Sequence, residues 1–330
     1  MQPAPFPRSR PRRLRRTPVL RELARETALS RRDLVAPLFV KQGIDEPAPI
    51  ASMPGHLQHT LDSLRKEAAE LAGLGVPALL LFGIPARKDA EGGEAWAPDG
   101  IVQRALRALA ADLGDEVALI ADLCLCEYTD HGHCGVLRGT GGRPQVDNDR
   151  TLERYGQIAV AQAAAGAAVV APSGMMDGQV GAVRAALDAA GFEDTAVLAY
   201  AAKYASGLYG PFREAAEGAP RFGDRAGYQM DPANGDEALR EVALDVAEGA
   251  DLVMVKPAGA YLDVLWRVKQ AFGLPTAAYQ VSGEYAMVKA AAARGWVDGE
   301  RVMLELLGGI RRAGADLVVT YFAREAASLL

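Results

Sequence analysis

Short, nearly continuous apolar runs alternate with longer amphipathic stretches from about residue 30 to the C-terminus. An apolar run without polar alternation is typical of a parallel strand that is buried on both faces. We therefore predict eight strands, at Leu34–Val40, Ala78–Gly83, Val117–Leu123, Ala167–Ala171, Ala196–Ala201, Leu252–Val255, Thr276–Val281 and Leu317–Tyr321.

The stretches between these runs carry apolar residues at helical spacing. Leucines stand at positions 61, 64, 71 and 74, and Thr60 can cap the first turn. Helices are predicted at Thr60–Leu74, Ile101–Leu113, Thr151–Ala165, Val180–Ala190, Asp236–Ala247, Tyr261–Phe272, Tyr285–Arg294 and Gly299–Ala313.

This alternation of strands and helices predicts a single (β/α)8 TIM barrel over residues 31–330. A doubly wound open sheet is the alternative architecture. No Gly-x-Gly-x-x-Gly follows the first predicted strand, which argues against a dinucleotide-binding fold.

The segment before the first strand has a different composition. Six arginines lie between Arg8 and Arg16, and four prolines precede position 12. Proline and clustered like charge oppose a packed element. We predict an N-terminal arm over residues 1–30, whose first ten or so residues are a disordered tail and whose remainder docks on a neighbouring subunit.

Composition and charge narrow the class of protein. The chain has 330 residues, half of them apolar, and a net charge of −6, which argues against a nucleic-acid binder. No apolar run approaches the roughly 20 residues that span a bilayer, and the N-terminus lacks the apolar core of a signal peptide. All three cysteines lie in one loop, which favours a reducing, cytoplasmic compartment over a disulfide framework.

That loop contains Cys124, Cys126 and Cys134 together with His131 and His133. Thiolate and imidazole are the ligands that zinc prefers, and three protein ligands with an open fourth position are typical of a catalytic zinc. We predict a metal site here. The alternative is three buried thiols, or one disulfide and a spare thiol.

Reactive side chains follow several of the predicted strands: Lys203, Lys256, Ser282 and Tyr321. Catalytic residues of a TIM barrel lie just after the C-terminal ends of its strands, so we expect these side chains to share one mouth. Burial and a neighbouring ammonium group both lower the pKa of a lysine, which favours Schiff-base formation with a ketone or aldehyde. Two salt-bridged lysines at the barrel rim are the alternative.

Carboxylate-binding groups are also present. Arg213 and Arg225 match a carboxylate in bidentate geometry, although solvated loop arginines are the simpler interpretation. The hydroxyl groups of Ser282 and Tyr321 are candidates to bind a second carboxylate, or are ordinary polar residues at strand ends. Residues 127–144 and 204–230 are Gly-rich or polar and are candidate lids over the mouth.

From about Leu34 to the C-terminus, the chain resembles the porphobilinogen synthase family, also called 5-aminolevulinate dehydratase. The resemblance rests on the cysteine loop, Ala-Lys-Tyr-Ala-Ser (202–206), Tyr-Gly-Pro-Phe-Arg (209–213), Tyr-Gln-Met-Asp-Pro-Ala-Asn (228–234), Met-Val-Lys-Pro (254–257) and Val-Ser-Gly-Glu-Tyr-Ala-Met (281–287).

The resemblance implies condensation of two 5-aminolevulinate molecules into porphobilinogen, with loss of two waters, in tetrapyrrole (haem) synthesis. Lys256 and Lys203 would form Schiff bases with the propionate-side and acetate-side substrates. Zinc on the three cysteines would polarise the second substrate. Carboxylate binding would fall to Arg213, Arg225 and Gln229 on the acetate side and to Ser282 and Tyr321 on the other.

The resemblance also implies features outside the active site. Glu241 matches a glutamate that holds an allosteric Mg²⁺ in some members, although an exposed helix glutamate is the alternative. The family forms octamers in which the arm wraps a neighbouring barrel. Gly174 departs from the pattern, since an aspartate is expected there.

Two other functions remain as alternatives. A Schiff-base aldolase on the same barrel explains one lysine but not two lysines and a thiol cluster. A non-enzymatic zinc protein that binds nucleic acid through the arginine-rich arm leaves both lysines unexplained.

Overall fold

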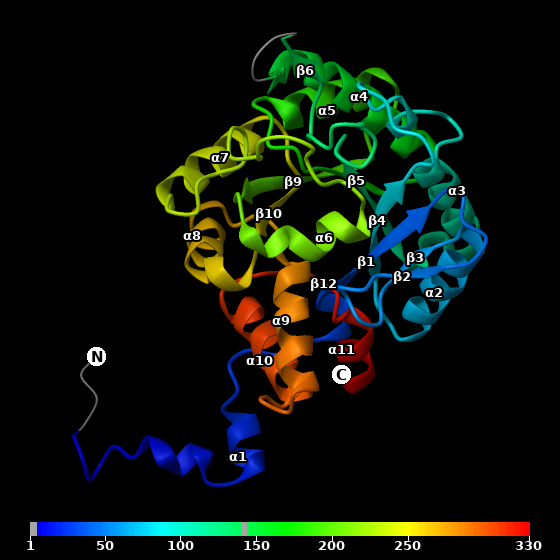
Figure 1. Ribbon diagram of the computed structural model, residues 1–330. Helices are drawn as coiled ribbons and strands as arrows, with labels where there is room; N and C mark the ends of the chain where they lie inside the picture. The colour runs from blue at the N-terminus through cyan, green and yellow to red at the C-terminus, as the bar shows by residue number, and fades with distance from the viewer. Residues whose placement is uncertain (1–4, 140–143) are drawn as a thin grey trace.

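The computed structural model describes residues 5–139 and 144–330 and shows a closed parallel barrel surrounded by helices (Figure 1). Its barrel strands are β1 (Leu34–Lys41), β4 (Ala78–Ile84), β5 (Ala118–Leu123), β8 (Val169–Pro172), β9 (Ala196–Lys203), β10 (Leu252–Lys256), β11 (Thr276–Gln280) and β12 (Leu317–Thr320). Each pairs in parallel with its neighbours in that order, and β12 returns to β1 through the Leu34–Val318 and Val35–Val319 pairs. The predicted (β/α)8 barrel is therefore confirmed.

The predicted helices are all present, with ends that shift by at most a few residues. They are α2 (Leu61–Gly73), α3 (Ile101–Leu113), α4 (Asn148–Ala164), α5 (Gln179–Ala189), α7 (Asp236–Ala247), α8 (Leu262–Phe272), α9 (Ser282–Ala293) and α10 (Gly299–Arg312). Side-chain caps fix several starts: the Thr60 hydroxyl accepts from the Ser63 amide at 3.1 Å, and the Asp147 carboxylate accepts from the Arg150 amide at 3.2 Å.

Several short elements were not predicted. They are α1 (Pro18–Leu23), α6 (Gly210–Ala215), α11 (Ala323–Leu329), β2 (Ala48–Pro49), β3 (Leu57–His59), β6 (Leu137–Arg138) and β7 (Gln145–Val146). Each is too short for its hydrophobic periodicity to be recognised. Helix α6 lies across the view of the barrel in Figure 1, between the strands and the viewer.

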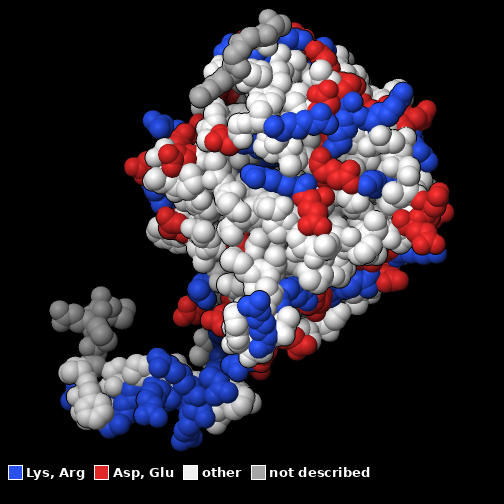
Figure 2. Space-filling model, viewed as in Figure 1, with Lys and Arg blue, Asp and Glu red and all other residues white. Residues whose placement is uncertain are grey.

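The N-terminal segment leads away from the barrel (Figure 1). It contains a short 3₁₀ helix (Pro11–Arg15) and α1, and neither element buries a residue, in line with the expectation that no packed element forms here. Basic side chains cover this segment in Figure 2. Residues 1–4, part of the tail predicted to be disordered, and residues 140–143, part of one predicted lid, lie outside the described residues.

No helix in the described part of the chain is long and apolar enough to cross a membrane.

Candidate active site

The ends of five barrel strands bring the predicted site residues to one mouth. Lys203 and Lys256 are the last residues of β9 and β10, and they lie directly opposite each other in the strand pairing. Cys124 follows β5, Ser282 follows β11 by two residues, and Tyr321 follows β12. The expectation that reactive side chains share the C-terminal end of the barrel is met.

Lys256 is buried in a cage of aromatic rings. Its Nζ lies 4.1 Å from the ring centre of Tyr279, 5.0 Å from that of Tyr200 and 5.2 Å from that of Phe212. Burial and the neighbouring Lys203 ammonium lower the pKa of Lys256 from 10.5 to about 7. A large fraction of this amine is therefore neutral, and hence nucleophilic, near neutral pH.

Lys203 is equally buried, and its ammonium group donates to the Ser173 carbonyl. Neither lysine forms a salt bridge among the described residues, so the alternative of salt-bridged rim lysines is wrong. Asp122, the residue before the last of β5, accepts from the Ser173 hydroxyl at 3.2 Å. Burial and nearby Glu127 raise the pKa of Asp122 to about 7.

The three cysteines form one buried cluster. Cys124, Cys126 and Cys134 are at most 3% exposed, are not disulfide-bonded, and place their sulfur atoms within 4.8 Å of one another. The Cys124 and Cys126 sulfurs are 3.4 Å apart. Hydrogen bonds from these two thiols lower the pKa of Cys134, so it is the first of the three to ionise.

This cluster fits a soft metal ion. Three converging sulfur donors, without a disulfide, are the donor set that zinc prefers, and burial alone gives no reason to gather three thiols at a polar mouth. Glu127 adds a carboxylate whose oxygen lies 3.2 Å from the Cys126 sulfur. His131 and His133 are turned to other partners: His131 Nε2 lies 3.3 Å from the Ala90 carbonyl oxygen, and His133 Nε2 lies 3.1 Å from that of Phe222.

Arg225 is buried, at 6% exposure. Its guanidinium donates to the carbonyls of Gly132 (3.0 Å) and Gly218 (2.6 Å), and these bonds partly replace those it would make to water. The interpretation as a solvated loop arginine is therefore wrong for this residue. The Nε atoms of Arg213 and Arg225 and the Nε2 atom of Gln229 are buried without a hydrogen-bond partner among residues 5–139 and 144–330. Unpaired buried donors of this kind are rare and call for an acceptor.

The second predicted carboxylate site lies between β12, α9 and α6. The Ser282 hydroxyl accepts from the Phe212 amide at 2.9 Å, and the hydroxyls of Tyr321 and Tyr279 are 2.9 Å apart. His56 Nε2 donates to the Tyr321 carbonyl at 2.9 Å. Burial lowers the pKa of His56 to about 4, so this imidazole stays neutral above that pH.

Glu241 lies on α7, outside the barrel, and is not one of the residues at the mouth. Burial raises its pKa, and acidic Asp177 and Glu237 add to the effect. In the described part of the chain, no set of three close potential metal ligands includes Glu241.

Sequence reasoning missed several residues of the site. Tyr200 on β9 and Tyr279 on β11 point toward Lys256. In the sequence, however, they cannot be told from the ordinary core residues of a strand. Glu127 directly follows Cys126, and a carboxylate next to a candidate ligand was a usable signal. His56 gave none, because its contact with Tyr321 joins residues 265 positions apart.

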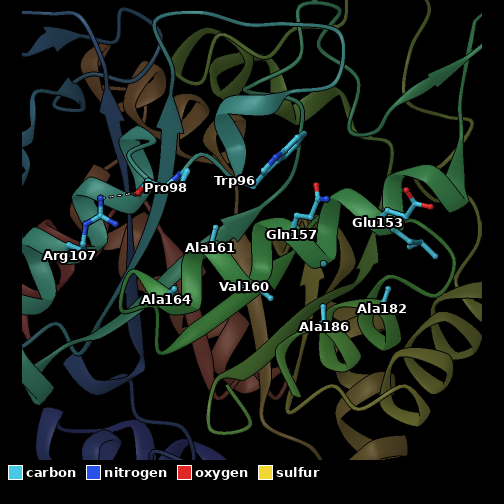
Figure 3. A pocket seen from close by; sticks show the side chains of 12 residues that line it. Trp96, Pro98, Arg107, Glu153, Gln157, Val160, Ala161, Ala164, Ala182 and Ala186 are labelled. Atoms are coloured by element: carbon cyan, nitrogen blue, oxygen red, sulfur yellow. Dashed lines mark hydrogen bonds between the residues drawn. The ribbon is translucent and has the colours of Figure 1, made fainter. Parts of the chain in front are cut away.

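A second hollow lies away from the mouth. An apolar groove of about 780 Å³ runs over α4 and α5 on the outside of the barrel, with Trp96 and Arg107 at its borders (Figure 3). None of the predicted site residues lines it. The mouth, which carries the reactive groups, is the candidate active site.

The fold and the mouth define a class: a (β/α)8-barrel enzyme with two buried lysines and a thiol cluster at its catalytic end. The family model for delta-aminolevulinic acid dehydratase matches residues 8–329. The chain belongs to this family. The predicted family, its lyase activity and the barrel are confirmed, whereas the aldolase and nucleic-acid-binding alternatives are not.

The similarity to known members of the family extends along the whole chain. The delta-aminolevulinic acid dehydratases of Streptomyces coelicolor and Mycobacterium tuberculosis are each 58% identical to it, over 98% and 100% of both chains, respectively. A crystal structure of the enzyme from Toxoplasma gondii, in complex with the reaction product porphobilinogen, superposes with a TM-score of 0.94 at 44% identity, covering 98% of this chain and 91% of that one.

Proposed function

We propose that this chain condenses two molecules of 5-aminolevulinate to porphobilinogen with loss of two waters, using Schiff bases on Lys256 and Lys203. The observation that carries the proposal is the pair of buried lysines, opposite each other at the ends of β9 and β10 and beside the thiol cluster. Two identical amino ketones bound side by side react within one complex, which removes the entropy cost of a bimolecular encounter.

Lys256 attacks first, because its lowered pKa supplies a neutral amine near pH 7. The amine adds to the ketone carbon of the propionate-side substrate, and loss of water gives the Schiff base. The hydroxyls of Ser282 and Tyr321 bind the carboxylate of this substrate and hold its ketone toward the lysine.

Lys203 forms the second Schiff base, with the acetate-side substrate. The unpaired donors of Arg213, Arg225 and Gln229 bind the carboxylate of that substrate. Both lysines are regenerated when the substrate atoms that close the pyrrole ring displace them.

Cys124, Cys126 and Cys134 would hold zinc. A bound zinc ion supplies Lewis acidity for a substrate carbonyl beside the amine of the acetate-side substrate. The three free thiols also suit a reducing compartment, which supports a cytoplasmic location.

Residues 204–230 form a lid over the mouth. Glu217, within this segment, pairs with Lys41 at the end of β1, and the Lys88 ammonium donates to the Glu217 carbonyl at 2.6 Å. Protection of this segment from protease on addition of 5-aminolevulinate would support the lid, whereas unchanged cleavage there would contradict it.

Residues 1–30 form an arm that packs on a neighbouring barrel of a homo-octamer. Four apolar side chains of the arm are between 56% and 78% exposed: Phe6, Leu14, Val19 and Leu23. Exposed apolar side chains of this density favour a protein partner. Deletion of residues 1–30 is expected to reduce the size of the assembly, as measured by light scattering.

Glu241, on α7, binds an allosteric Mg²⁺. Magnesium is therefore expected to lose its effect on activity in Glu241→Ala.

The main test is direct. The purified protein is incubated with 5-aminolevulinate, and porphobilinogen is measured by mass, with and without a zinc chelator. Product that is lost on chelation and restored by zinc supports both the reaction and the metal. Borohydride reduction in the presence of substrate is expected to label Lys256 and Lys203, and labelling elsewhere would overturn their assignment.

A further inference from the structure

Gly174 lies in the loop after β8, and the hydroxyl of Tyr155 from α4 occupies the space beside it. A Cβ atom at Gly174 would overlap the Tyr155 hydroxyl oxygen and lie 2.8 Å from Cζ of the ring. The backbone at Gly174 does not adopt a positive φ. Close approach of the tyrosine, rather than backbone conformation, is therefore what requires glycine at this position.

The hydroxyl that fills this space has a defined partner. Tyr155 is fully buried, and its hydroxyl donates to the carbonyl oxygen of Cys134 at 2.7 Å. Cys134 is the one cysteine of the cluster that is distant in sequence from the other two. Its position therefore depends on contacts that hold its segment against the barrel.

Helix α4 supplies those contacts from one face. Thr151 and Tyr155 are four residues apart, so their side chains lie one above the other along the helix, and Asp147 is the residue that caps its start. The Asp147 amide donates to the Val136 carbonyl at 2.8 Å, and the Thr151 hydroxyl accepts from the Val136 amide at 3.0 Å. A Cβ at Gly135 would overlap the Thr151 hydroxyl oxygen, so the segment lies directly on the helix.

We propose that Tyr155 and Gly174 act as a pair that positions Cys134 for metal binding. Tyr155 is a positioning residue, and Gly174 is the residue that admits its hydroxyl. The inference rests on the proposed zinc site. It also explains the missing aspartate in the loop after β8: a side chain at position 174 and a tyrosine at position 155 exclude each other.

The first experiment measures zinc affinity rather than activity, because Ser173, next to Gly174, also contacts Lys203. The full-length enzyme is stripped of metal, and its zinc affinity is determined by competition with a chromogenic chelator. Tyr155→Phe removes only the hydroxyl and is expected to weaken zinc binding about tenfold, as changes to groups that orient ligands typically do. The charge-transfer bands of the cobalt(II)-substituted enzyme are expected to shift in the same variant.

Tyr285→Phe is the matched control. Tyr285 is also buried, and its hydroxyl donates to a backbone carbonyl, that of Pro54, at 2.6 Å. This bond is remote in sequence and in the barrel from the cysteine loop. Tyr285→Phe is expected to retain wild-type zinc affinity, whatever it does to the melting temperature.

The second experiment tests the pairing itself through a double-mutant cycle. Gly174→Ala is expected to weaken zinc binding, because the added methyl group displaces the tyrosine hydroxyl. Tyr155→Leu is expected to weaken it to a similar extent. In the Tyr155→Leu background the methyl group meets no hydroxyl, so the double variant should bind zinc no more weakly than Tyr155→Leu alone.

The outcomes separate this inference from the proposed function. If the wild-type protein binds no zinc through its cysteines, the zinc site itself fails. If the wild type binds zinc and Tyr155→Phe binds it equally well with an unchanged cobalt spectrum, Tyr155 does not position Cys134. Additive losses in the double variant would refute the pairing of Tyr155 with Gly174.

Discussion

Replacement of Lys256 by methionine is expected to stabilise the fold while it abolishes Schiff-base chemistry at this position. The lysine is buried among Tyr279, Tyr200 and Phe212, where burial and Lys203 disfavour its charged form. Methionine has a similar length and no charge to desolvate. Lys256 therefore lowers the free energy of unfolding, and the Lys256→Met variant regains that free energy.

The size and pH dependence of the effect follow from the pKa of Lys256, which is 10.5 in the unfolded chain and about 7 in the folded one. Below pH 7 the folded protein must bury the ammonium or lose its proton, and the full cost is present. Above pH 7 the folded lysine is neutral, and the cost fades as the unfolded chain also deprotonates. Linkage gives a destabilisation of about 4 kcal/mol at pH 7 and about 2 kcal/mol at pH 9.

Urea denaturation of both proteins at one fixed chain concentration, at several pH values between 6 and 9, measures this difference. Lys66→Met, at an exposed position on α2, is the control and should change the free energy of unfolding little at any pH. A Lys256→Met advantage that is absent, independent of pH, or larger at pH 9 than at pH 7 would refute the reasoning.

Three further predictions concern separate parts of the chain. Cys126→Ser should abolish stoichiometric zinc binding, measured by atomic absorption, and lower kcat more than about tenfold; retention of one zinc per chain would contradict the cysteine site. Ser282→Ala removes a hydroxyl that also accepts from the Phe212 amide, and should raise KM for 5-aminolevulinate several-fold with a smaller change in kcat; an unchanged KM would remove Ser282 from the carboxylate site. Burial and Glu248 raise the pKa of Asp245 to about 8, against 3.8 in the unfolded chain. The fold therefore loses stability as the pH rises from 3.8 to 8, because the carboxyl ionises in the unfolded chain but stays protonated in the folded one. Asp245→Asn should therefore raise the melting temperature at pH 8 in the presence of chelator but not at pH 4, and the opposite pH trend would contradict this.

The barrel was predictable from sequence because its signal is repeated and local. Each strand is an apolar run, and the reactive residues follow those runs directly, so Lys203 and Lys256 could be placed at strand ends before their surroundings were known. Helix α9 starts earlier than predicted, at Ser282, because the Glu284 carboxylate accepts from the Val281 amide at 2.7 Å and begins the helix.

What could not be predicted depends on contacts between distant segments. Arg225 has the sequence context of a loop arginine, and its burial depends on hydrogen bonds to the carbonyls of Gly132 and Gly218 that no local pattern predicts. The aromatic cage of Lys256 draws on several elements at once. Gly174 was recognised as a departure, but its reason lies in Tyr155, a helix residue that no local pattern connects to it.

Closure of the barrel by β12 on β1 also determines when this enzyme can begin to work. Val318 and Val319 pair with Leu34 and Val35, so the first strand made on the ribosome waits for the last. Until residues 317–330 have been synthesised, β1 and β11 each lack a neighbour, and Tyr321 is absent from the mouth. A chain in which β12 is not yet in place is therefore an open sheet with unpaired edges at β1 and β11, and such edges favour association with other chains until β12 closes them.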